Sequence, residues 1–313
     1  MATILITHGI PTAGLDVLAE HKIIMPAPLA AYTEEELLQV IPESDAVLAC
    51  GRLTEAVICA GKKLQIIANY GAGYDSVDVK AAARCGVPVT NIPDTVTDAT
   101  AELAIGLMLA VSRRIGEMNL RLRKEPSATL FGMGRYMGSM LKGRTLGIIG
   151  CGRIGSRVAV LAKALGMRVL GYSRRGVPSD VAEYCDLPTL LATADVVSLH
   201  CPSTPETRHL LNAQAFAAMK PGAIVINTAR GAVIDHDAMV EALRSGRLAG
   251  VGLDVYPNEP AIPEVLLALD NVVCTPHVGS NTAQTRADMA RACALQILDA
   301  LAGKRPENIV NGI

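Results

Sequence analysis

A glycine-rich turn in the middle of the chain constrains its fold more than any other feature. The stretch GIIGCGRIG, residues 147–155, has the spacing G-x-G-x-x-G. Such turns also occur by chance, so the surrounding sequence must carry the inference. Residues 145–149 form an apolar run suited to a buried strand, and residues 156–165 repeat apolar side chains at helical spacing. A second apolar run at 167–172 follows directly, which predicts a strand, a helix and a parallel strand.

In this setting the turn predicts a bound dinucleotide. Gly150 allows the tight turn, Gly152 lets the backbone approach a pyrophosphate, and Gly155 lets the helix pack closely on the strand. The phosphates would lie against free N–H groups at the positive end of the helix. We therefore expect cofactor contacts from these three glycines and from Arg153 and Ile154.

The end of the second strand predicts which dinucleotide binds. An acidic residue there would bind the ribose 2'-hydroxyl of NAD and repel a 2'-phosphate. The sequence instead has YSRR, in which Ser173 can donate a hydrogen bond and Arg174 and Arg175 carry guanidinium groups suited to a phosphate. A solvent-exposed basic turn is the alternative interpretation. The pattern favours NADP(H), with NAD(H) as the second candidate.

The composition excludes several classes of partner. The chain has 313 residues, of which 50% are hydrophobic, enough for two domains with their own cores. The formal net charge is -1 and no dense run of Lys and Arg is present, which argues against nucleic acid or a membrane as partner.

The eight cysteines are scattered singly, without the spacing of a zinc site. We expect no bound metal and a reducing, cytoplasmic location, since the first residues also lack the basic region of a signal peptide.

Short apolar runs alternate with helical stretches along most of the chain. This alternation is typical of parallel sheets that helices cover on both faces. We predict the α/β fold class, with two doubly wound parallel-sheet domains: a Rossmann dinucleotide-binding domain, residues 97–284, inserted in a flavodoxin-like substrate-binding domain, residues 1–96 and 285–313. Ligands of such sheets bind beyond the carboxyl ends of the strands. We therefore expect the chemistry in those loops and the cleft between the two domains.

A long apolar segment precedes the glycine motif. Residues 97–115 begin with cap-type residues and predict one long, buried helix. Residues 119–142 are irregular in pattern, with glycines among Met and Arg residues, and predict an arm or a lid.

Three loops after predicted strands carry groups suited to reducing a carbonyl. Arg230 follows the strand in INTARGAVID and could hold a carboxylate and an adjacent carbonyl oxygen. Asp254 ends the next strand, with Glu259 five residues later, and His277 follows the strand after that. A carboxylate beside an imidazole favours its protonated form, so His277 could donate a proton if Glu259 lies beside it. Of the other histidines, His200 is the strongest candidate for lining the cleft, because it also ends a strand.

Taken in order, GIIGCGRIG, NTARGAVID, GLDVYPNEP and TPHVGS resemble the D-isomer-specific 2-hydroxyacid dehydrogenases. NYGAGYDSVD and VTDATAELAIGLMLA are similar to further segments of that family, so the resemblance covers nearly the whole chain. It implies that Arg230 binds the carboxylate and carbonyl of the substrate, that His277 is the acid/base and that Glu259 orients it. It also implies that Asp254 faces the nicotinamide amide.

The resemblance implies contacts from other segments as well. For the substrate carboxylate it implies the backbone of one loop: Tyr70, Gly71, Ala72 and Gly73. For the cofactor we expect further residues at strand ends and at the start of the long helix: Thr100, Cys201, Pro202, Thr228 and Asp254. The segment at about 101–146 is similar to the dimerisation region of the family, which implies a homodimer.

The expected reaction is direct hydride transfer from NADPH to the keto carbon of a small 2-keto acid, with His277 as proton donor. Within the family, the SRR segment is similar to the NADP-dependent glyoxylate and hydroxypyruvate reductases and to related aromatic pyruvate reductases. Glyoxylate or hydroxypyruvate is the expected substrate, with phenylpyruvate-type and sugar-derived keto acids as alternatives. The chain has no Trp, which family members often carry in the arm, so Met133, Tyr136, Met137 or Met140 would shape the pocket instead.

Two functions of other kinds are alternatives. A nucleotide-sensing corepressor of the type that resembles this family acts through partners, and the joint presence of Arg230, Glu259 and His277 argues against it. A formate dehydrogenase on the same scaffold would need N-terminal and substrate-loop elements that we do not find in the sequence. The fold alone selects none of these functions.

Overall fold

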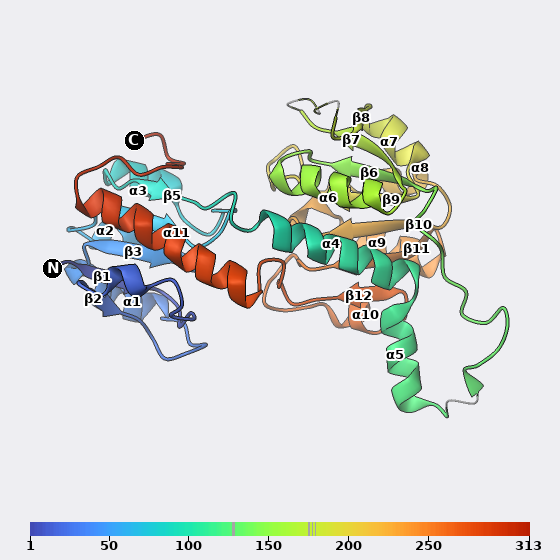
Figure 1. The fold of residues 1–313 in the computed structure, drawn as a ribbon, viewed down its shortest axis with the longest axis horizontal. Coiled ribbons are helices and arrows are strands. Elements are labelled where there is room, and N and C mark those ends of the chain that lie inside the picture. Colours follow the sequence, from blue (N-terminus) through green and yellow to red (C-terminus); the bar gives the residue numbers. More distant parts are fainter. Residues whose placement is uncertain (127–128, 175, 177, 179) are drawn as a thin grey trace. The chain divides into compact units, whose positions relative to one another are not determined.

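In a computed structural model of the chain, the described residues form two compact units (Figure 1). The structure describes residues 1–126, 129–174, 176, 178 and 180–313. The first unit consists of Met1–Thr97 and Ser280–Ile313, and the second of Asp98–Gly279. Each unit is built on one parallel sheet, which confirms the predicted fold class.

The described part of the first unit has a five-stranded parallel sheet in the order β2-β1-β3-β4-β5. Its strands are β1 (Thr3–Ile6), β2 (Lys22–Ile24), β3 (Ala46–Ala49), β4 (Ile66–Asn69) and β5 (Val89–Thr90). The central strands β3 and β4 are buried along their whole length, and all their side chains except that of Asn69 are apolar. The strand order is that of the flavodoxin-like fold.

Helices cover this first sheet. They are α1 (Glu34–Val40), α2 (Glu55–Ala60), α3 (Val79–Arg84) and α11 (Ala283–Leu301), with the 3-10 turns η1 (Asp16–Leu18) and η2 (Ile41–Glu43). α11 packs against β3 and β4 although it lies more than two hundred positions later, as Figure 1 shows. The tail after α11 stays in the same unit, where Ile309 forms an antiparallel bridge with Thr90.

Seven parallel strands form the sheet of the second unit among its described residues, in the order β12-β11-β10-β9-β6-β7-β8. The strands are β6 (Thr145–Ile149), β7 (Arg168–Tyr172), β8 (Glu183–Tyr184), β9 (Val196–Leu199), β10 (Ala223–Asn227), β11 (Leu248–Leu253) and β12 (Val272–Cys274). From β6 the chain first adds strands on one side and then, from β9, on the other. This reversal beside β6 is the switch point at which Rossmann folds bind their ligand.

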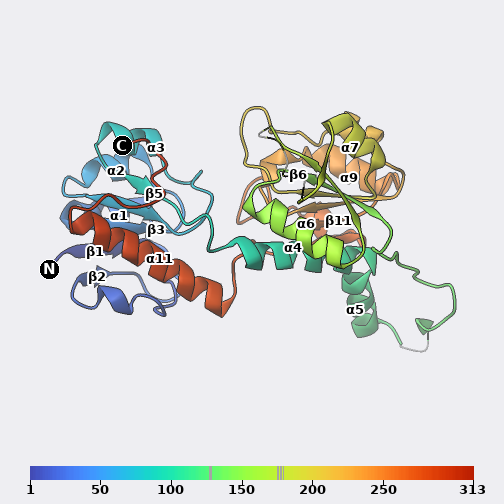
Figure 2. The same ribbon diagram turned by 45° about the horizontal axis from the view of Figure 1, so that its top comes forward.

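Both faces of the second sheet are covered. Ile148 of β6 packs in a cluster with α4 (Thr97–Ser112) and α6 (Arg153–Ala164), whereas Ile149 packs in the opposite cluster. That opposite cluster includes α7 (Leu187–Thr193), α8 (Ala213–Ala218) and α9 (His236–Arg244). Figure 2 shows α4 and α6 side by side. The 3-10 turn η4 (Gly231–Val233) and the short α10 (Glu264–Leu267) complete the unit's elements.

The segment after α4 corrects the sequence prediction. Instead of one helix over 97–115, α4 ends at Ser112, Arg114 adopts a left-handed conformation with φ of 55°, and α5 (Ile115–Lys124) follows. The prediction of irregular chain from residue 119 is therefore wrong as far as Lys124. α5 is held by the buried Glu117, which accepts hydrogen bonds from Arg114 at 2.6 and 2.8 Å and from Arg121 at 3.0 Å. Charged pairs rather than apolar periodicity mark this helix, so the pattern did not reveal it.

No helix within the described part of the chain combines the length and the apolar character that crossing a membrane requires.

Candidate active site

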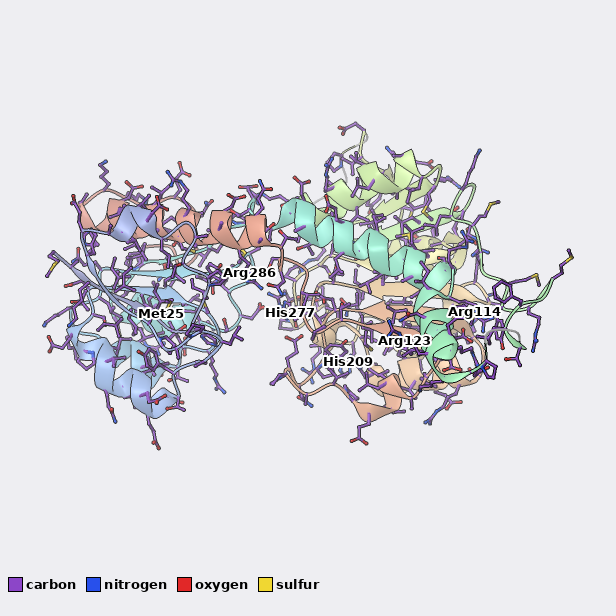
Figure 3. The ribbon with its side chains drawn as sticks, turned by 60° about the horizontal axis from the view of Figure 1, so that its bottom comes forward. Met25, Arg114, Arg123, His209, His277 and Arg286 are labelled. Carbon is purple, nitrogen blue, oxygen red and sulfur yellow. The ribbon has the colours of Figure 1, made fainter. Side chains whose placement is uncertain are left out.

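The second sheet places three predicted site residues at one edge. β10, β11 and β12 are parallel neighbours, so their carboxyl ends lie at the same edge. Arg230 lies three residues after β10, Asp254 directly follows β11, and His277 lies three residues after β12. His277 is labelled in Figure 3. These loops occupy the edge where ligands of open parallel sheets bind.

The imidazole of His277 hydrogen-bonds the carboxylate of Glu259. Nδ1 of His277 lies 2.6 Å from Oε2 of Glu259, and the other carboxylate oxygen accepts a hydrogen bond from the backbone N–H of Tyr256 at 3.0 Å. The His277 side chain is 52% exposed and that of Glu259 34%. The structure thus brings together two residues that lie 18 positions apart, with the carboxylate more sheltered than the imidazole.

Electrostatics sets the direction of this hydrogen bond. Burial by itself would raise the pKa of Glu259, but hydrogen bonds from His277 and Tyr256 and the charges of His277 and Arg230 outweigh it, and the pKa lies below its usual value. Glu259 is therefore ionised at neutral pH and can only accept, so Nδ1 of His277 is the donor. This leaves Nε2 of His277 as the nitrogen that can exchange a proton with a bound molecule.

Asp254 organises the loop that carries His277. Its carboxylate is buried and accepts hydrogen bonds from Thr275 Oγ1 at 2.7 Å, Val278 N–H at 2.8 Å and Gly279 N–H at 2.9 Å. Its backbone carbonyl accepts the N–H of His277 at 2.9 Å. These bonds hold His277 in a left-handed conformation, φ of 52°. The sequence did not reveal this structural role, and the contact of Asp254 with a nicotinamide amide stays a prediction.

Hydrogen bonds at the end of β10 hold Arg230 in place. Nη1 of Arg230 donates to the carbonyl of Ala229 at 2.7 Å, and the side chain of Asn227 donates to the carbonyl of Arg230 at 2.9 Å. Its charge is among the causes that lower the pKa of Glu259, so the guanidinium acts on the same site. A cation, a carboxylate and an imidazole thus converge on one edge of the second sheet.

The glycine turn fits the phosphates of a dinucleotide. Gly150 has φ of 99°, and a Cβ there would lie 2.6 Å from the backbone nitrogen of Cys201. A Cβ on Gly155 would lie 2.1 Å from the carbonyl oxygen of Gly150, so helix and strand need a glycine here. At Gly152, in contrast, a Cβ would meet nothing within 4 Å, and no side chain caps the first turn of α6. The first N–H groups of a helix have no partner within the helix, so those at the start of α6, such as that of Ile154, suit an anion bound at this turn.

The residues predicted to contact a 2'-phosphate follow β7. Arg174 forms an ion pair with Glu206, with Nη1 and Oε2 separated by 3.5 Å, and both side chains are more than half exposed. The hydroxyl of Thr204 donates to the same Glu206 oxygen at 2.7 Å. Ser173 directly precedes Arg174, whereas Arg175 lies outside the described residues. Glu206 is a residue that the sequence reading missed, because it lies in the loop after a different strand.

The other expected cofactor contacts lie after β9, after β10 and on α4. Cys201 and Pro202 follow β9, and buried Thr228 follows β10 with its hydroxyl 3.5 Å from Nδ1 of His200. Burial lowers the pKa of His200 to about 4, so this histidine is neutral and is not a proton donor at neutral pH. Thr100 is buried on α4, where a Cβ on Gly279 would lie 3.4 Å from its Oγ1.

In the first unit, the loop predicted to receive a carboxylate turns its carbonyls inward. The Asn69 side chain donates to the carbonyls of Gly71 at 3.0 Å and Gly73 at 2.9 Å, and the Asn91 side chain donates to that of Ala72 at 2.7 Å. Within the described chain, no acceptor pairs with the backbone N–H of Ala72 or Gly73. Two adjacent backbone N–H groups of this kind suit a carboxylate.

Arg286 of α11 lies beside this loop and was not predicted from the sequence. Its guanidinium stacks over the Tyr70 ring, 5.6 Å from the ring centroid, and its Nε donates to Asn281 Oδ1 at 3.2 Å. Burial raises the pKa of Tyr70 to about 12, so the phenol remains a donor and binds the carbonyl of Arg286 at 2.8 Å. Figure 3 labels Arg286 near one end of its helix. Only the packing of α11 onto β4 reveals this neighbour, since 216 positions separate Tyr70 and Arg286.

As for metals, the described residues contain no group of three or more His, Cys, Asp and Glu side chains that could hold an ion.

The sequence and the fold are similar to those of known proteins. Residues 105–279 match the family described as D-isomer specific 2-hydroxyacid dehydrogenase, NAD binding domain. The chain is 41% identical to the glyoxylate reductase of Thermococcus litoralis, with 98% of this chain and 96% of that protein covered. It is 36% identical to the D-3-phosphoglycerate dehydrogenase of Synechocystis sp., with 99% of this chain but 56% of that protein covered.

A solved structure agrees over both units. The NADPH-dependent glyoxylate/hydroxypyruvate reductase of Sinorhizobium meliloti, in complex with NADP and malonate, matches with a TM-score of 0.86 at 31% sequence identity. The match covers 99% of this chain and 96% of that one.

Proposed function

We propose a reaction from one premise, namely that the chain belongs to the D-isomer-specific 2-hydroxyacid dehydrogenase family. As a member it is an oxidoreductase that uses a nicotinamide dinucleotide. We propose that it reduces a small 2-keto acid, glyoxylate or hydroxypyruvate, to the D-2-hydroxy acid with NADPH. One observation carries this proposal: the 2.6 Å contact between His277 Nδ1 and Glu259 Oε2, at the sheet edge that also carries Arg230.

In this proposal each charged group has one task. His277 holds a proton at Nε2 and delivers it to the carbonyl oxygen of the substrate. Ionised Glu259 accepts the hydrogen bond from Nδ1 and stabilises the imidazolium until the proton leaves. Arg230 donates to the substrate carboxylate and carbonyl oxygen, and its charge offsets the negative charge that develops on that oxygen. The nicotinamide cofactor, when bound, supplies the hydride.

The preference for NADPH is proposed from the residues after β7. No carboxylate is present in the segment YSRR, residues 172–175, where a residue that binds the ribose 2'-hydroxyl would stand. Arg174 already binds an anionic group, the carboxylate of Glu206, at 3.5 Å. A 2'-phosphate would compete for the same guanidinium and would offer it more negative charge. The Sinorhizobium meliloti reductase, whose structure contains NADP, supports this choice.

The choice of substrate is proposed from the relatives and from the loops. The glyoxylate reductase of Thermococcus litoralis, similar along nearly its whole length, supports glyoxylate. In the first unit, the backbone N–H groups of Ala72 and Gly73 are proposed to bind a carboxylate. Since every 2-keto acid carries that carboxylate, rates must decide among glyoxylate, hydroxypyruvate and phenylpyruvate.

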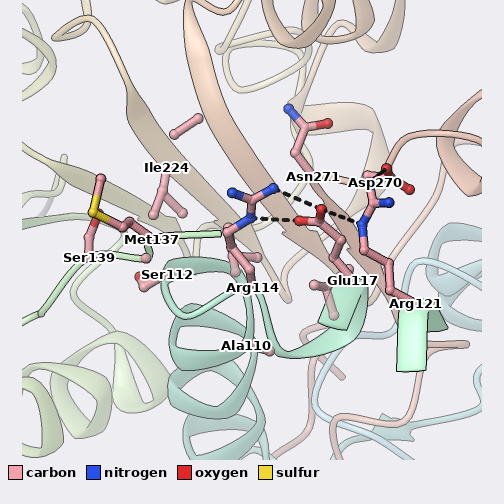
Figure 4. Close-up of a pocket in the computed structure, with 14 residues that line it drawn as sticks. Ala110, Ser112, Arg114, Glu117, Arg121, Met137, Ser139, Ile224, Asp270 and Asn271 are labelled. Atoms are coloured by element: carbon pink, nitrogen blue, oxygen red, sulfur yellow. Dashed lines mark hydrogen bonds and ion pairs between the residues drawn. The ribbon is translucent and has the colours of Figure 1, made fainter. Parts of the chain in front are cut away.

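We also propose that the protein is a homodimer. α5 exposes Ile115, Leu120 and Leu122, and the following segment exposes Phe131, Met133, Met137 and Met140. Beside these residues lies a hollow of about 440 Å³ (Figure 4). It is lined by residues of α4 and α5 and by residues 137–139, Ile224, Ala249, Asp270, Asn271 and Val273. It lies at the opposite ends of the strands from His277, so it is not the catalytic site. Such a run of exposed apolar side chains is typical of an interface, and sedimentation at several concentrations tests for a dimer.

Initial rates test the proposed reaction. NADPH and NADH oxidation is followed by absorbance with glyoxylate, hydroxypyruvate and phenylpyruvate at limiting and saturating concentrations. We expect turnover with NADPH preferred over NADH, and the highest kcat/KM identifies the substrate. Absence of turnover with all three keto acids would refute the proposed reaction.

A matched pair of variants tests the proton donor. His277 and His209 both have left-handed backbones, with φ of 52° and 50°, a conformation that Asn tolerates. His277→Asn should lower kcat roughly a hundredfold or more, the usual contribution of a general acid. His209→Asn, in an exposed histidine, is the control and should leave kcat unchanged. Near-normal turnover of His277→Asn would remove His277 from the mechanism.

A further inference from the structure

Two cysteines that the sequence places far apart meet on the surface of the first unit. Cys59 lies in α2 and Cys85 directly follows α3, and their sulfur atoms are 2.7 Å apart although 26 positions separate them. Cys85 is exposed and Cys59 is partly exposed, so solutes can reach both thiols. No other two of the eight cysteines lie within hydrogen-bonding distance of each other among the described residues.

The two helices that carry these thiols are held together at other points. Glu55 of α2 forms an ion pair with Arg84 of α3. Where the helices begin, Leu53 pairs with the chain before α3, donating to the carbonyl of Ser76 at 2.9 Å and accepting the N–H of Asp78 at 3.1 Å. A disulfide needs a sulfur separation of about 2.05 Å. Sulfur atoms at 2.7 Å between two clamped helices can close that gap by small side-chain rotations.

We propose that Cys59 and Cys85 are a redox modification site, which forms a reversible disulfide with a small-molecule disulfide as oxidant. This inference goes beyond the proposed reduction of keto acids and does not depend on it. In the reducing compartment that the other cysteines indicate, both thiols are reduced at rest, and the bond forms when the thiol pool becomes oxidised.

The reaction is two successive thiol–disulfide exchanges. The thiolate of Cys85, the more exposed of the two, attacks one sulfur of the oxidant, RSSR, and expels one RS⁻. The thiolate of Cys59 then attacks the sulfur of Cys85 and expels the second RS⁻. Two protein thiols lose two electrons and two protons, and RSSR gains them to become two RSH.

The environment of Cys59 suits the second step. Its hydrogen bond with Cys85 is the main cause that raises the pKa of the Cys59 thiol. A raised pKa keeps Cys59 protonated, and so less reactive, while Cys85 stands beside it. Once Cys85 has reacted, its thiol no longer shares this hydrogen bond and Cys59 can ionise and attack.

The disulfide should stabilise the first unit without changing catalysis. It would close a loop between two helices and so restrict the unfolded chain. The disulfide joins the ends of α2 and α3. The loop of residues 70–73 instead lies before the start of α3, where the backbone hydrogen bonds of Leu53 already fix the position of the chain. We therefore expect a rise in melting temperature of roughly 5 °C in the oxidised protein, with an unchanged KM for the keto acid.

Peptide mapping of the full-length protein tests the proposal. The protein is equilibrated with oxidised and reduced glutathione at a series of ratios, quenched with acid, alkylated and digested with trypsin. In the oxidised samples we expect peptide 53–62 to be joined to peptide 85–113 through a disulfide, and dithiothreitol should separate them. The proposal would be overturned if, at glutathione ratios that oxidise a reference dithiol, the two peptides are alkylated separately or each cysteine carries glutathione.

Variants provide the second measurement. Cys59→Ser and Cys85→Ser should each abolish the difference in melting temperature between oxidised and reduced protein. Cys185→Ser, which alters a partly exposed cysteine without a thiol partner among the described residues, is the matched control and should retain it. A redox-dependent shift that persists in Cys59→Ser would also overturn the proposal. The mapping of the unmodified chain needs no variant, so a variant that fails to fold does not affect it.

Discussion

Replacing Glu259 by Gln tests whether His277 depends on the charge of its partner or only on its position. Gln has nearly the same size and keeps an oxygen that can accept the hydrogen bond now 2.6 Å long, but it removes the negative charge. Two unit charges about 4 Å apart attract by about 4 kcal/mol at an effective dielectric constant of 20 and by about 1 kcal/mol in water.

The exposure of the pair selects a value between these limits. Because His277 is 52% exposed and Glu259 34%, solvent screens much of the attraction between them. We therefore take about 2 kcal/mol for the stabilisation of the imidazolium by the Glu259 carboxylate. Each loss of about 1.4 kcal/mol makes the protonated donor about tenfold scarcer relative to the neutral imidazole, so Glu259→Gln should lower kcat at neutral pH roughly 30-fold. The KM for NADPH should not change, because the glycine turn lies in the loop after another strand.

The assay is kcat and KM at neutral pH with the keto acid that the wild-type protein prefers, alongside a melting curve for each variant. Glu264→Gln is the control, since this exposed carboxylate lies five positions later at the start of α10 and no role in the site is assigned to it. A folded Glu259→Gln protein with kcat within about threefold of wild type would refute the electrostatic argument, because Coulomb attraction of this size could not then be acting.

Three further changes probe the cofactor site and the fold. Glu206→Gln should lower the KM for NADPH severalfold and leave that for NADH unchanged, because Arg174 would lose a competing carboxylate 3.5 Å away; equal changes in both would speak against Arg174 as the phosphate ligand. Gly155→Ala should abolish cofactor binding in calorimetry, because its Cβ would lie 2.1 Å from the carbonyl oxygen of Gly150, and an unchanged Kd would contradict this. Glu117→Gln should reduce the free energy of unfolding by about 2 kcal/mol at neutral pH, since it leaves two arginines without their buried partner. Burial raises the pKa of Glu117, but its arginine partners outweigh burial and the folded-state pKa is lowered, so the unfolded state binds the proton first. The stabilisation by Glu117 is therefore present above the ordinary pKa of Glu and is lost as the pH falls through the lowered value. Denaturant titrations in which the free energy of unfolding has the same pH dependence in the wild-type and Glu117→Gln proteins would show that this linkage is absent.

The elements that the sequence predicted well are those with a local signature. The glycine turn needs only the spacing of Gly150, Gly152 and Gly155 between a strand and a helix, all within about ten residues. The alternation of apolar runs with helical stretches likewise indicated parallel sheets, because burial on both faces is visible in each strand by itself. α5 was missed for the same reason, since ion pairs around Glu117 hold it and apolar periodicity does not.

The sequence by itself therefore determined the fold class and the candidate residues at the strand ends. The tertiary structure decided which of these side chains meet, although the resemblance already implied the pairing of Glu259 with His277. The contact of His277 with Glu259, the buried bonds of Asp254 within the His277 loop, the stacking of Arg286 on Tyr70 and the proximity of Cys59 and Cys85 all join different elements. Periodicity reports only how a segment buries its own side chains. Contacts between segments depend on strand order and loop conformation, which the packing of the whole unit sets.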